Sequence, residues 1–375
     1  MTTGPTVLDA RTASPHFPGI GRTAVGLARA LAECPAAPRM MLLHGPNPDW
    51  RLPVAQWPAI TCRSSPFGLR QHWEVRARLR RADAALYHSP SYLMPFAPGV
   101  PAIVTCNDLI PLTVPGLFGR PARLAFRLAH ALAFRAAFAI VVPSGATRDE
   151  VARLFPRHAP KLEVVPHGWE FAQAVDEDRC ALLRRQLGVP DAYVLVVGTN
   201  KPHKNLRVLA EAWGMIASRP QGGATRPALV LAGPRDSRFD DGGPPAERLR
   251  AAGQLVSTGP VPDDALAALY SGATLLVCPS RAEGFGLPVV EAMGLGAPVV
   301  CSRIPALVET AGEAAALFDP TDAVALARLL EHLLEAPAER ESMRQAGRAR
   351  AGAFTWARAA GTMSALYSRV AGGRA

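Results

Sequence analysis

The feature that most constrains the fold is the alternation of short, mostly apolar runs with stretches of helical periodicity. Val, Leu and Ile fill these runs with little polar alternation, which is typical of parallel strands covered on both faces. The runs lie at residues 6–9, 40–43, 85–87, 102–105, 139–142 and 162–165, and then at 193–197, 228–231, 254–256, 275–277 and 298–300. Strands that alternate with helices in this way predict two doubly wound α/β domains in tandem.

A length of 375 residues fits two domains of about 150–200 residues each. We place an N-terminal domain at 1–170 and a C-terminal domain at 171–355, because a charged segment separates two strands there. Residues 356–375 predict a last helix whose apolar stripe has no partner nearby in the sequence. The stripe consists of Trp356, Met363, Leu366 and Tyr367.

The cysteines, the N-terminal residues and the most apolar stretch indicate in which cellular compartment the protein is expected. The six cysteines are scattered, without a CxxC pair or ligand spacing, and predict buried thiols in a reducing environment. Residues 1–10 lack a basic start followed by an apolar run, so we expect no signal peptide. The most apolar long stretch, 124–142, contains Arg127, His130 and Arg135 and should not span a bilayer. We expect a cytoplasmic protein.

The net charge of +10 is concentrated in the first half. Residues 1–170 hold 19 Arg and Lys against 10 Asp and Glu, whereas residues 171–375 hold 22 against 21. The densest basic run is Arg70–Arg81, where Leu69, Trp73 and Leu79 lie among the arginines. Such a helix can bind acidic lipid headgroups at the inner face of the cell membrane, or it can simply be a solvated face. No nucleic-acid-binding motif accompanies the charge, so nucleic acid is not an expected partner.

One strand leads into the loop 197–206, where Lys204 lies at the entry to a helix. A cation is unfavourable at a helix N-terminus unless an anion binds at the same place. The chain contains 38 arginines and only three lysines, and two of those lysines are Lys201 and Lys204. The loop therefore predicts a phosphate site, and a solvated loop lysine is the alternative.

A second strand leads into the segment 279–291, which contains Gly-Phe-Gly-Leu-Pro between Glu283 and Glu291. Glycines allow the backbone to approach a ligand closely, and Pro288 fits the start of a helix. The N–H groups of Gly286 and Leu287 would then face a phosphate or sugar oxygen. Carboxylates beside an anion site are costly unless they accept hydrogen bonds, and sugar hydroxyls are suitable donors.

A third candidate is the loop 17–23, in which Gly19 and Gly21 open a helix. This is half of a dinucleotide-binding fingerprint and lacks the third glycine, so a dehydrogenase is not indicated. The loop can hold a diphosphate or an acceptor headgroup, or it can be a plain tight turn.

Taken together, these motifs resemble the family 4 glycosyltransferases of the GT-B fold, especially the mannosyltransferase-like members of bacterial glycan assembly. Besides the loops above, the matching segments are 9–11, 88–90, 105–111, 142–144, 165–168, 259–261 and 354–356. The resemblance implies two Rossmann-like domains that face each other across a cleft, with the last helix crossing back to the N-terminal domain.

The resemblance also implies the roles of individual residues. Lys204 would face the donor diphosphate, Glu283 the donor sugar and Glu291 the ribose, with Asn107 and Asp108 in the loop that faces the sugar. The expected catalytic residues are Lys204, Glu283, Asn107 and Asp108. The expected donor-binding residues are Gly19, Gly21, Gly198, Thr199, Lys201, His203, Val261, Gly284, Phe285, Gly286, Leu287 and Glu291.

Two positions depart from the family pattern. Members usually have His where this chain has Asn107, and Asn cannot titrate near neutral pH. Members usually have Arg where this chain has His203, which weakens the positive charge of the phosphate site. The first departure raises the alternative of a partner subunit that binds nucleotide sugar without turnover.

The implied reaction is a retaining transfer of a hexose from a nucleotide-diphosphate sugar, with GDP-mannose weakly favoured, to a glycan or lipid-linked acceptor. The leaving phosphate would take the acceptor's proton, so we expect neither a metal nor another cofactor. The Asp-Glu-Asp segment 176–178 lies in the linker and predicts a solvated helix start. A nucleotide-sugar epimerase is a further alternative, although its acid/base cluster is not evident.

Overall fold

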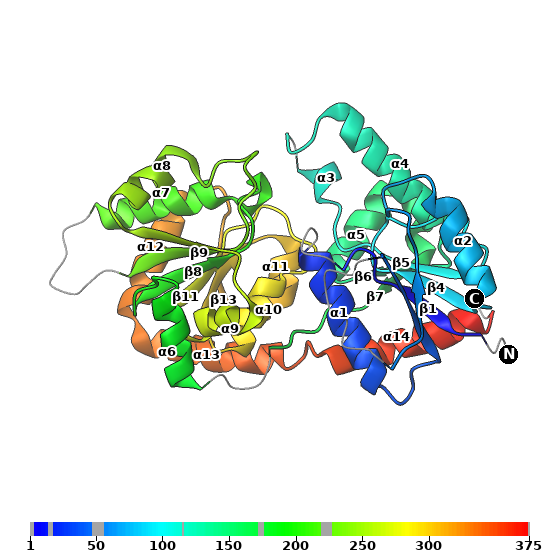
Figure 1. Ribbon diagram of the computed structural model, residues 1–375. Helices are drawn as coiled ribbons and strands as arrows, with labels where there is room; N and C mark the ends of the chain where they lie inside the picture. Colours follow the sequence, from blue (N-terminus) through cyan, green and yellow to red (C-terminus); the bar gives the residue numbers. More distant parts are fainter. Residues whose placement is uncertain are drawn as a thin grey trace. The chain divides into compact units, whose positions relative to one another are not determined.

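The computed structural model describes residues 4–13, 18–46, 56–114, 116–171, 176–218 and 227–373. The chain folds as two units (Figure 1). Unit 1 comprises Met1–Gly168 together with Phe354–Ala375, and unit 2 comprises Trp169–Ala353.

Unit 1 contains a seven-stranded parallel sheet in the order β3-β2-β1-β4-β5-β6-β7. Its strands are β1 (Thr6–Asp9), β2 (Met40–His44), β3 (Ala59–Thr61), β4 (Leu86–Ser89), β5 (Ala102–Thr105), β6 (Ala139–Val142) and β7 (Leu162–Val164). Its helices are α1 (Pro18–Glu33), α2 (Gln71–Arg81), α3 (Ile110–Thr113), α4 (Arg120–Ala136), α5 (Gly145–Leu154), the 3₁₀ helix η1 (Pro156–Lys161) and α14 (Trp356–Ala371).

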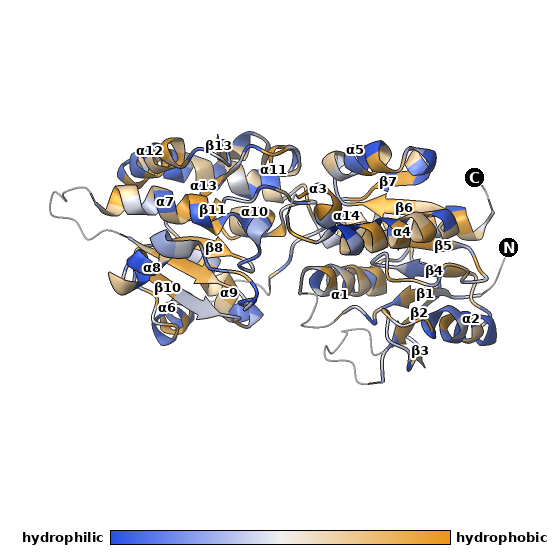
Figure 2. Cartoon of the chain, turned by 90° about the horizontal axis from the view of Figure 1, so that it is seen from above, coloured by the Kyte–Doolittle hydropathy of each residue, from blue (hydrophilic) through white to orange (hydrophobic). Residues whose placement is uncertain are grey.

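Helices cover both faces of this sheet, as continuous apolar strands require. Successive strand residues alternate between two cores. Leu8 belongs to the core that contains residues of α1 and α14, whereas Val7 belongs to the core that contains residues of α2, α4 and α5. In Figure 2, strands such as β6 are coloured as hydrophobic, as expected for strands that are covered on both faces. The apolar stripe of α14 lies against α1, so the partner that its neighbours in sequence do not supply comes from the start of the chain.

Unit 2 contains a six-stranded parallel sheet in the order β10-β9-β8-β11-β12-β13. Its strands are β8 (Tyr193–Val197), β9 (Ala228–Ala232), β10 (Leu255–Gly259), β11 (Leu275–Cys278), β12 (Val299–Ser302) and β13 (Ala315–Phe318). Its helices are α6 (Glu177–Gln186), η2 (Pro202–Lys204), α7 (Leu206–Ala217), α8 (Gly243–Ala251), α9 (Asp263–Ser271), α10 (Leu287–Gly294), α11 (Pro305–Ala311), η3 (Gly312–Ala314), α12 (Ala323–Glu335) and α13 (Pro337–Ala351).

The boundary between the units lies two residues before the position set from the sequence. A Cβ on Gly168 would lie 2.2 Å from the backbone nitrogen of Trp356, so Gly168 is packed within unit 1. The next residue, Trp169, donates its indole N–H to the carbonyl of Ala351 at 3.0 Å and packs against Gly294 in unit 2. Trp356 packs on Gly168 in unit 1 and Trp169 packs on Gly294 in unit 2, so the chain passes from unit 1 to unit 2 at the peptide bond between Gly168 and Trp169.

Membrane-spanning helices and disulfides were expected to be absent. In the described part of the chain, no helix combines the length and apolar character that a bilayer crossing needs. All six cysteines are free thiols, and all except the half-buried Cys34 are buried.

Candidate functional site

The sheet of unit 2 has a switch point between β8 and β11. The chain leads from β8 to β9 and β10 on one side, and from β11 to β12 and β13 on the other. Loops that leave the carboxyl ends of β8 and β11 therefore diverge, and ligands of open α/β sheets bind in the crevice that this leaves. Both predicted loops of unit 2 start here.

Lys204 and Glu283 form an ion pair at this switch point. The Lys204 ammonium donates to Glu283 Oε1 at 2.6 Å, and their side chains are only 18% and 10% exposed. The Ser280 hydroxyl donates to the same oxygen at 2.6 Å. Burial by itself would raise the pKa of Glu283, but Lys204 and the hydroxyl of Ser280 outweigh it and hold that pKa below its usual value. The carboxylate is therefore ionised at neutral pH.

The loop after β8 is packed tightly beside Lys204. Gly198 has φ 145°, and a Cβ placed there would lie 3.4 Å from Lys204 Cε. A Cβ on Gly233, in the loop after β9, would lie 2.2 Å from the carbonyl oxygen of Gly198. Asn200 fastens the same two loops, because its amide bonds the backbone of Asp236 in both directions. The half-buried Thr199 and Lys201 lie in this loop.

Gly286 caps the N-terminus of α10, which follows β11. Its φ is 99°, and a Cβ there would lie 2.5 Å from Leu307, so only glycine fits. Pro288 is the second helical residue, and the Thr310 hydroxyl holds the carbonyl of the buried Phe285 at 2.6 Å. The first N–H groups of a helix have no partner within it, which makes this end of α10 suited to an anion. The buried Gly284 lies between Glu283 and Phe285.

Glu291 and His203 are the two buried polar residues among those predicted in unit 2. Glu291 is 4% exposed and accepts a hydrogen bond from the Tyr270 hydroxyl at 2.8 Å. Burial, together with Lys204 and Lys201, lowers the pKa of His203 to about 4, so its ring is neutral at pH 7. Among the described residues, its Nδ1 has no hydrogen-bond partner.

Two predicted residues of unit 2 remain, Leu287, which is the first residue of α10, and Val261. Val261 is half-buried and lies between β10 and α9, after Gly259, which has φ 70°. Because β10 is separated from β8 by β9, Val261 lies two strands away from the start of the Lys204 loop.

The other four predicted residues belong to unit 1. Asn107 and Asp108 follow β5 and are half-buried. The Asn107 amide donates to the carbonyl of Pro90 at 3.1 Å, and its oxygen lies 3.0 Å from His167 Nε2. Asp108 accepts from the amide of Ile110, the first residue of α3, at 3.0 Å.

The structure corrects the predicted loop at 17–23. Helix α1 begins at Pro18, so the chain is already helical where a loop was expected. Gly19 and Gly21 lie in the first turn of α1 and open a helix as predicted. Proline fits a first helical position because its fixed φ is helical and its missing N–H is not needed there. Phe17 lies outside the described residues.

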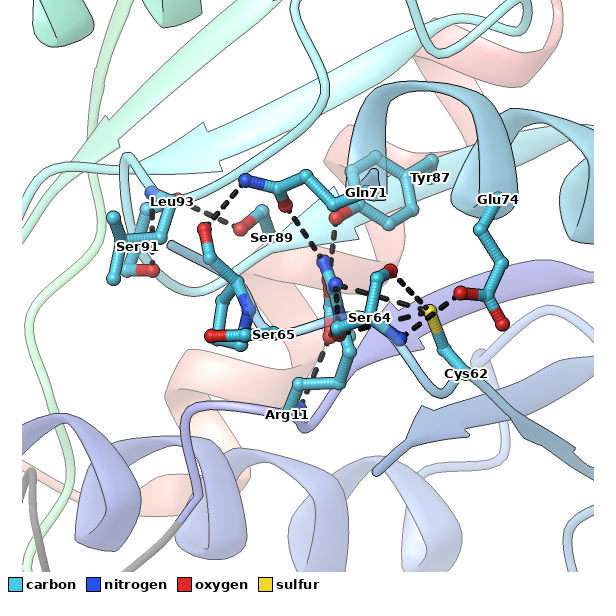
Figure 3. A network of polar contacts seen from close by, with 12 residues as sticks. Arg11, Cys62, Ser64, Ser65, Gln71, Glu74, Tyr87, Ser89, Ser91 and Leu93 are labelled. Atoms are coloured by element: carbon cyan, nitrogen blue, oxygen red, sulfur yellow. Dashed lines mark hydrogen bonds and ion pairs between the residues drawn. The ribbon is translucent and has the colours of Figure 1, made fainter. Parts of the chain in front are cut away.

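Sequence reasoning assigned no role to a buried polar network at the β1–β4 switch point of unit 1 (Figure 3). Arg11 binds Asp9 with distances down to 2.7 Å, and the Tyr87 hydroxyl donates to Asp9 at 2.5 Å. Arg11 also donates to Gln71 at 3.1 Å and to the Ser64 carbonyl at 3.3 Å. The network fastens the loop after β1 to the first turn of α2. Its groups are held by one another, which indicates a structural role.

Other missed residues act on predicted ones: Ser280 binds Glu283, Tyr270 binds Glu291 and His167 binds Asn107. Ser280 could have been found from its place two residues after a strand. Tyr270 lies in the last turn of α9, and nothing in the local sequence indicates its hydroxyl's partner.

The basic segment is also corrected. Leu79 is fully buried in the core, so it is not part of an exposed apolar face. The exposed apolar residues are Phe67, Leu69 and Trp73, at 60%, 75% and 68%. The segment 176–178 is the exposed start of α6, as predicted. Among the described residues, no group of three or more His, Cys, Asp or Glu is arranged to hold a metal ion.

Comparison with known proteins agrees with this geometry. The family described as Glycosyltransferase Family 4 matches residues 18–172, and the family described as Glycosyl transferases group 1 matches residues 182–350. The chain is 28% identical over 356 residues to the O-antigen chain mannosyltransferase B of Escherichia coli, covering 90% of this chain and 92% of that protein. It is 32% identical over 289 residues to the serotype-specific mannosyltransferase WbdA of Escherichia coli.

The match with WbdA covers 73% of this chain and 34% of WbdA, so this chain corresponds to about a third of that protein. Among solved structures, sucrose-phosphate synthase from Thermosynechococcus elongatus superposes with a TM-score of 0.77 at 22% identity, covering 99% of this chain and 100% of that one. Two doubly wound units, family matches in both and this shared fold lead to one assignment. The chain belongs to the family 4 glycosyltransferases of the GT-B fold.

Proposed function

We propose that this glycosyltransferase moves mannose from GDP-mannose to a glycan or lipid-linked acceptor, with retention of anomeric configuration and without a metal ion. The names of the similar proteins, both mannosyltransferases, favour mannose. The single observation that carries the proposal is the Lys204–Glu283 pair beside the N-terminus of α10.

The proposed reaction needs no protein nucleophile. The bond between the anomeric carbon and the phosphate oxygen breaks while the acceptor oxygen bonds to the same face of that carbon. The acceptor's proton moves to the departing phosphate oxygen, so atoms and charges balance. Lys204 and the first amides of α10 stabilise the negative charge that develops on the diphosphate.

Glu283 has two tasks in this proposal. It holds the ammonium of Lys204 in place, and its remaining acceptor capacity orients the hydroxyls of the donor sugar. Glu291, held by Tyr270, takes the ribose hydroxyls. Neutral His203 leaves Lys204 and Lys201 as the charges at the diphosphate.

The direct test is turnover by the purified protein with labelled GDP-mannose, UDP-glucose and other donors, in EDTA. Transfer or donor hydrolysis in EDTA supports a metal-independent transferase, and NMR of the product's anomeric proton reports retention or inversion. Donor binding without turnover under every acceptor would instead favour the partner subunit suggested by Asn107. Conversion of the donor sugar with its nucleotide still attached would identify an epimerase.

The site itself is tested with Lys204→Ala. The change removes the Lys204 charge from the diphosphate site and leaves Glu283 without its cationic partner, so turnover should fall about 100-fold or more. Arg207→Ala is the matched control, because Arg207 is a nearby cation on α7 that is 72% exposed and pairs with Glu211. Equal activity of the two variants would contradict the assignment of the site.

We also propose a peripheral contact with acidic membrane, supported by the exposed Phe67, Leu69 and Trp73 and by the exposed Arg70, Arg80 and Arg81 of the same segment. Apolar side chains among arginines suit a lipid headgroup layer. Replacing Arg76, Arg78, Arg80 and Arg81 with Gln should release the protein from vesicles rich in anionic lipid. The exposed Leu124 and Leu128 of α4 offer a comparison, and release only by their change to Ser would move the contact to α4.

A further inference from the structure

The histidine expected at position 107 is absent from that position, but the structure places another histidine beside it. Asn107 follows β5, Pro90 follows β4 and His167 follows β7. Because the carboxyl ends of parallel strands meet at one edge of a sheet, these three residues converge from separate loops. His167 reaches across the end of β6 and lies 3.0 Å from Asn107.

The hydrogen bonds determine which way the Asn107 amide is turned. The Pro90 carbonyl can only accept, so the nitrogen of the Asn107 amide must face it at 3.1 Å. The amide oxygen then faces His167 Nε2, which must carry the proton of the imidazole. Burial lowers the pKa of His167 to about 4, so at neutral pH this is the only proton on the ring.

The His167 ring is itself held in place. Its centroid lies 6.0 Å from that of Trp356. Gly168, the next residue, packs on the backbone of Trp356. The first residue of the C-terminal helix thereby fixes the segment that carries His167.

We propose that His167 is a positioning residue, which locks the Asn107 amide so that its second N–H donates to a substrate sugar hydroxyl at this edge of the unit 1 sheet. This inference rests on the proposed function. The Asn107 nitrogen has two hydrogens and Pro90 takes one, so a donor remains on a half-buried side chain. The position where the family has an imidazole then presents a neutral amide, and the imidazole lies one hydrogen bond behind it.

A double-mutant cycle tests whether His167 acts through Asn107. His167→Phe keeps a ring but removes the Nε2 donor, and it should lower kcat about 10-fold or more, with a smaller change in KM for the donor. Asn107→Ala should lower kcat by at least as much. The kcat of the double variant should lie within about twofold of the kcat of Asn107→Ala, because the amide that His167 positions is already absent in that variant.

Recovery of kcat by a side chain with a donor at the same position provides the second readout. Gln places its amide nitrogen near the position of His Nε2, so His167→Gln should restore most of the kcat that His167→Phe loses. Asn is one carbon shorter and should not restore it. A purely structural role would instead make activity follow thermal stability across Phe, Gln and Asn. His158→Phe, at a histidine of η1, is the control for loss of an imidazole in unit 1.

The outcomes separate the two proposals. A wild-type protein without turnover on any donor would overturn the proposed function, and this inference with it. An active wild type whose His167→Phe and Asn107→Ala losses multiply, or in which Gln fails to restore kcat, would overturn the inference alone.

Discussion

Four histidines of the described residues, three buried and one half-buried, are held neutral by their surroundings. Burial lowers the pKa of His88 to about 3 and the pKa values of His130, His167 and His203 to about 4. The unfolded chain, with ordinary values near 6.5, binds more protons than the folded chain below that pH. The stability that these rings contribute is complete above about pH 6.5 and is lost as the pH falls toward 4.

His130 offers the clearest test of this pH dependence, because it is 1% exposed and lies among aromatic rings. Its ring centroid lies 4.0 Å from that of Tyr92 and 4.1 Å from that of Phe126. His130→Phe cannot take up the proton. The difference in unfolding free energy between pH 7 and pH 4.5 should therefore shrink by about 2–3 kcal/mol. Denaturant unfolding at the two pH values measures it. Phe126→Leu, in the same cluster, should lower the unfolding free energy equally at both pH values. If His130→Phe leaves the pH dependence of the unfolding free energy unchanged, the low pKa of His130 is contradicted.

Individual site residues were predictable from the sequence where a charge stands out against its surroundings. Lys204 is one of three lysines among 41 basic residues, and Glu283 follows a strand and precedes two glycines. Their direct pairing was not predictable, since it depends on β8 and β11 becoming neighbours in the sheet. The role of Gly286 was predictable from its motif, whereas its contact with Leu307 was not.

At the scale of elements, the inner strands were predicted and two edge strands were missed. β3 has only three residues, of which Ala59 and Thr61 are exposed, so it carries no apolar run. β13 reads Ala-Ala-Leu-Phe, a composition that also fits a helix, and three of its residues are half-buried. Edge strands are paired on one side only, so the sequence pattern that identifies inner strands is weak in them.

The contact between α1 and α14 gives a prediction for a pair of glycines. A Cβ on Gly26 of α1 would lie 2.3 Å from the Trp356 ring, whereas a Cβ on the exposed Gly361 of α14 would meet nothing within 4 Å. Gly26→Ala should therefore destabilise unit 1 by about 1–3 kcal/mol through overpacking. Gly361→Ala should stabilise it by about 0.5–1 kcal/mol, since alanine loses less backbone entropy in a helix. Thermal unfolding of the two variants measures both, and shifts in the same direction would contradict this packing.

At the scale of the whole molecule, one unit is formed by a single segment of the chain and the other by two separate segments. Unit 2 is a single segment, Trp169–Ala353, whereas unit 1 needs Phe354–Ala375 from the far end of the chain. The C-terminal helix supplies buried residues to the core of unit 1, and Tyr367 within it binds His88 of β4 at 2.7 Å. The sequence indicated this only as an apolar stripe without a neighbour, because its partner lies more than 300 residues away.

This difference predicts how the units behave when they are separated. Residues 169–353 should fold alone with a cooperative unfolding transition, since their core is complete within the segment. Residues 1–168 alone should aggregate or stay partly unfolded, because the faces of α1 and β4 that α14 covers would be exposed to water. A chain in which residues 1–168 continue through a flexible linker into residues 354–375 should recover cooperative unfolding. Circular dichroism with thermal melting compares all three. A stable, cooperative 1–168 fragment would show that α14 is an accessory to unit 1, whereas failure of the linked chain would show that unit 1 depends on unit 2 for folding.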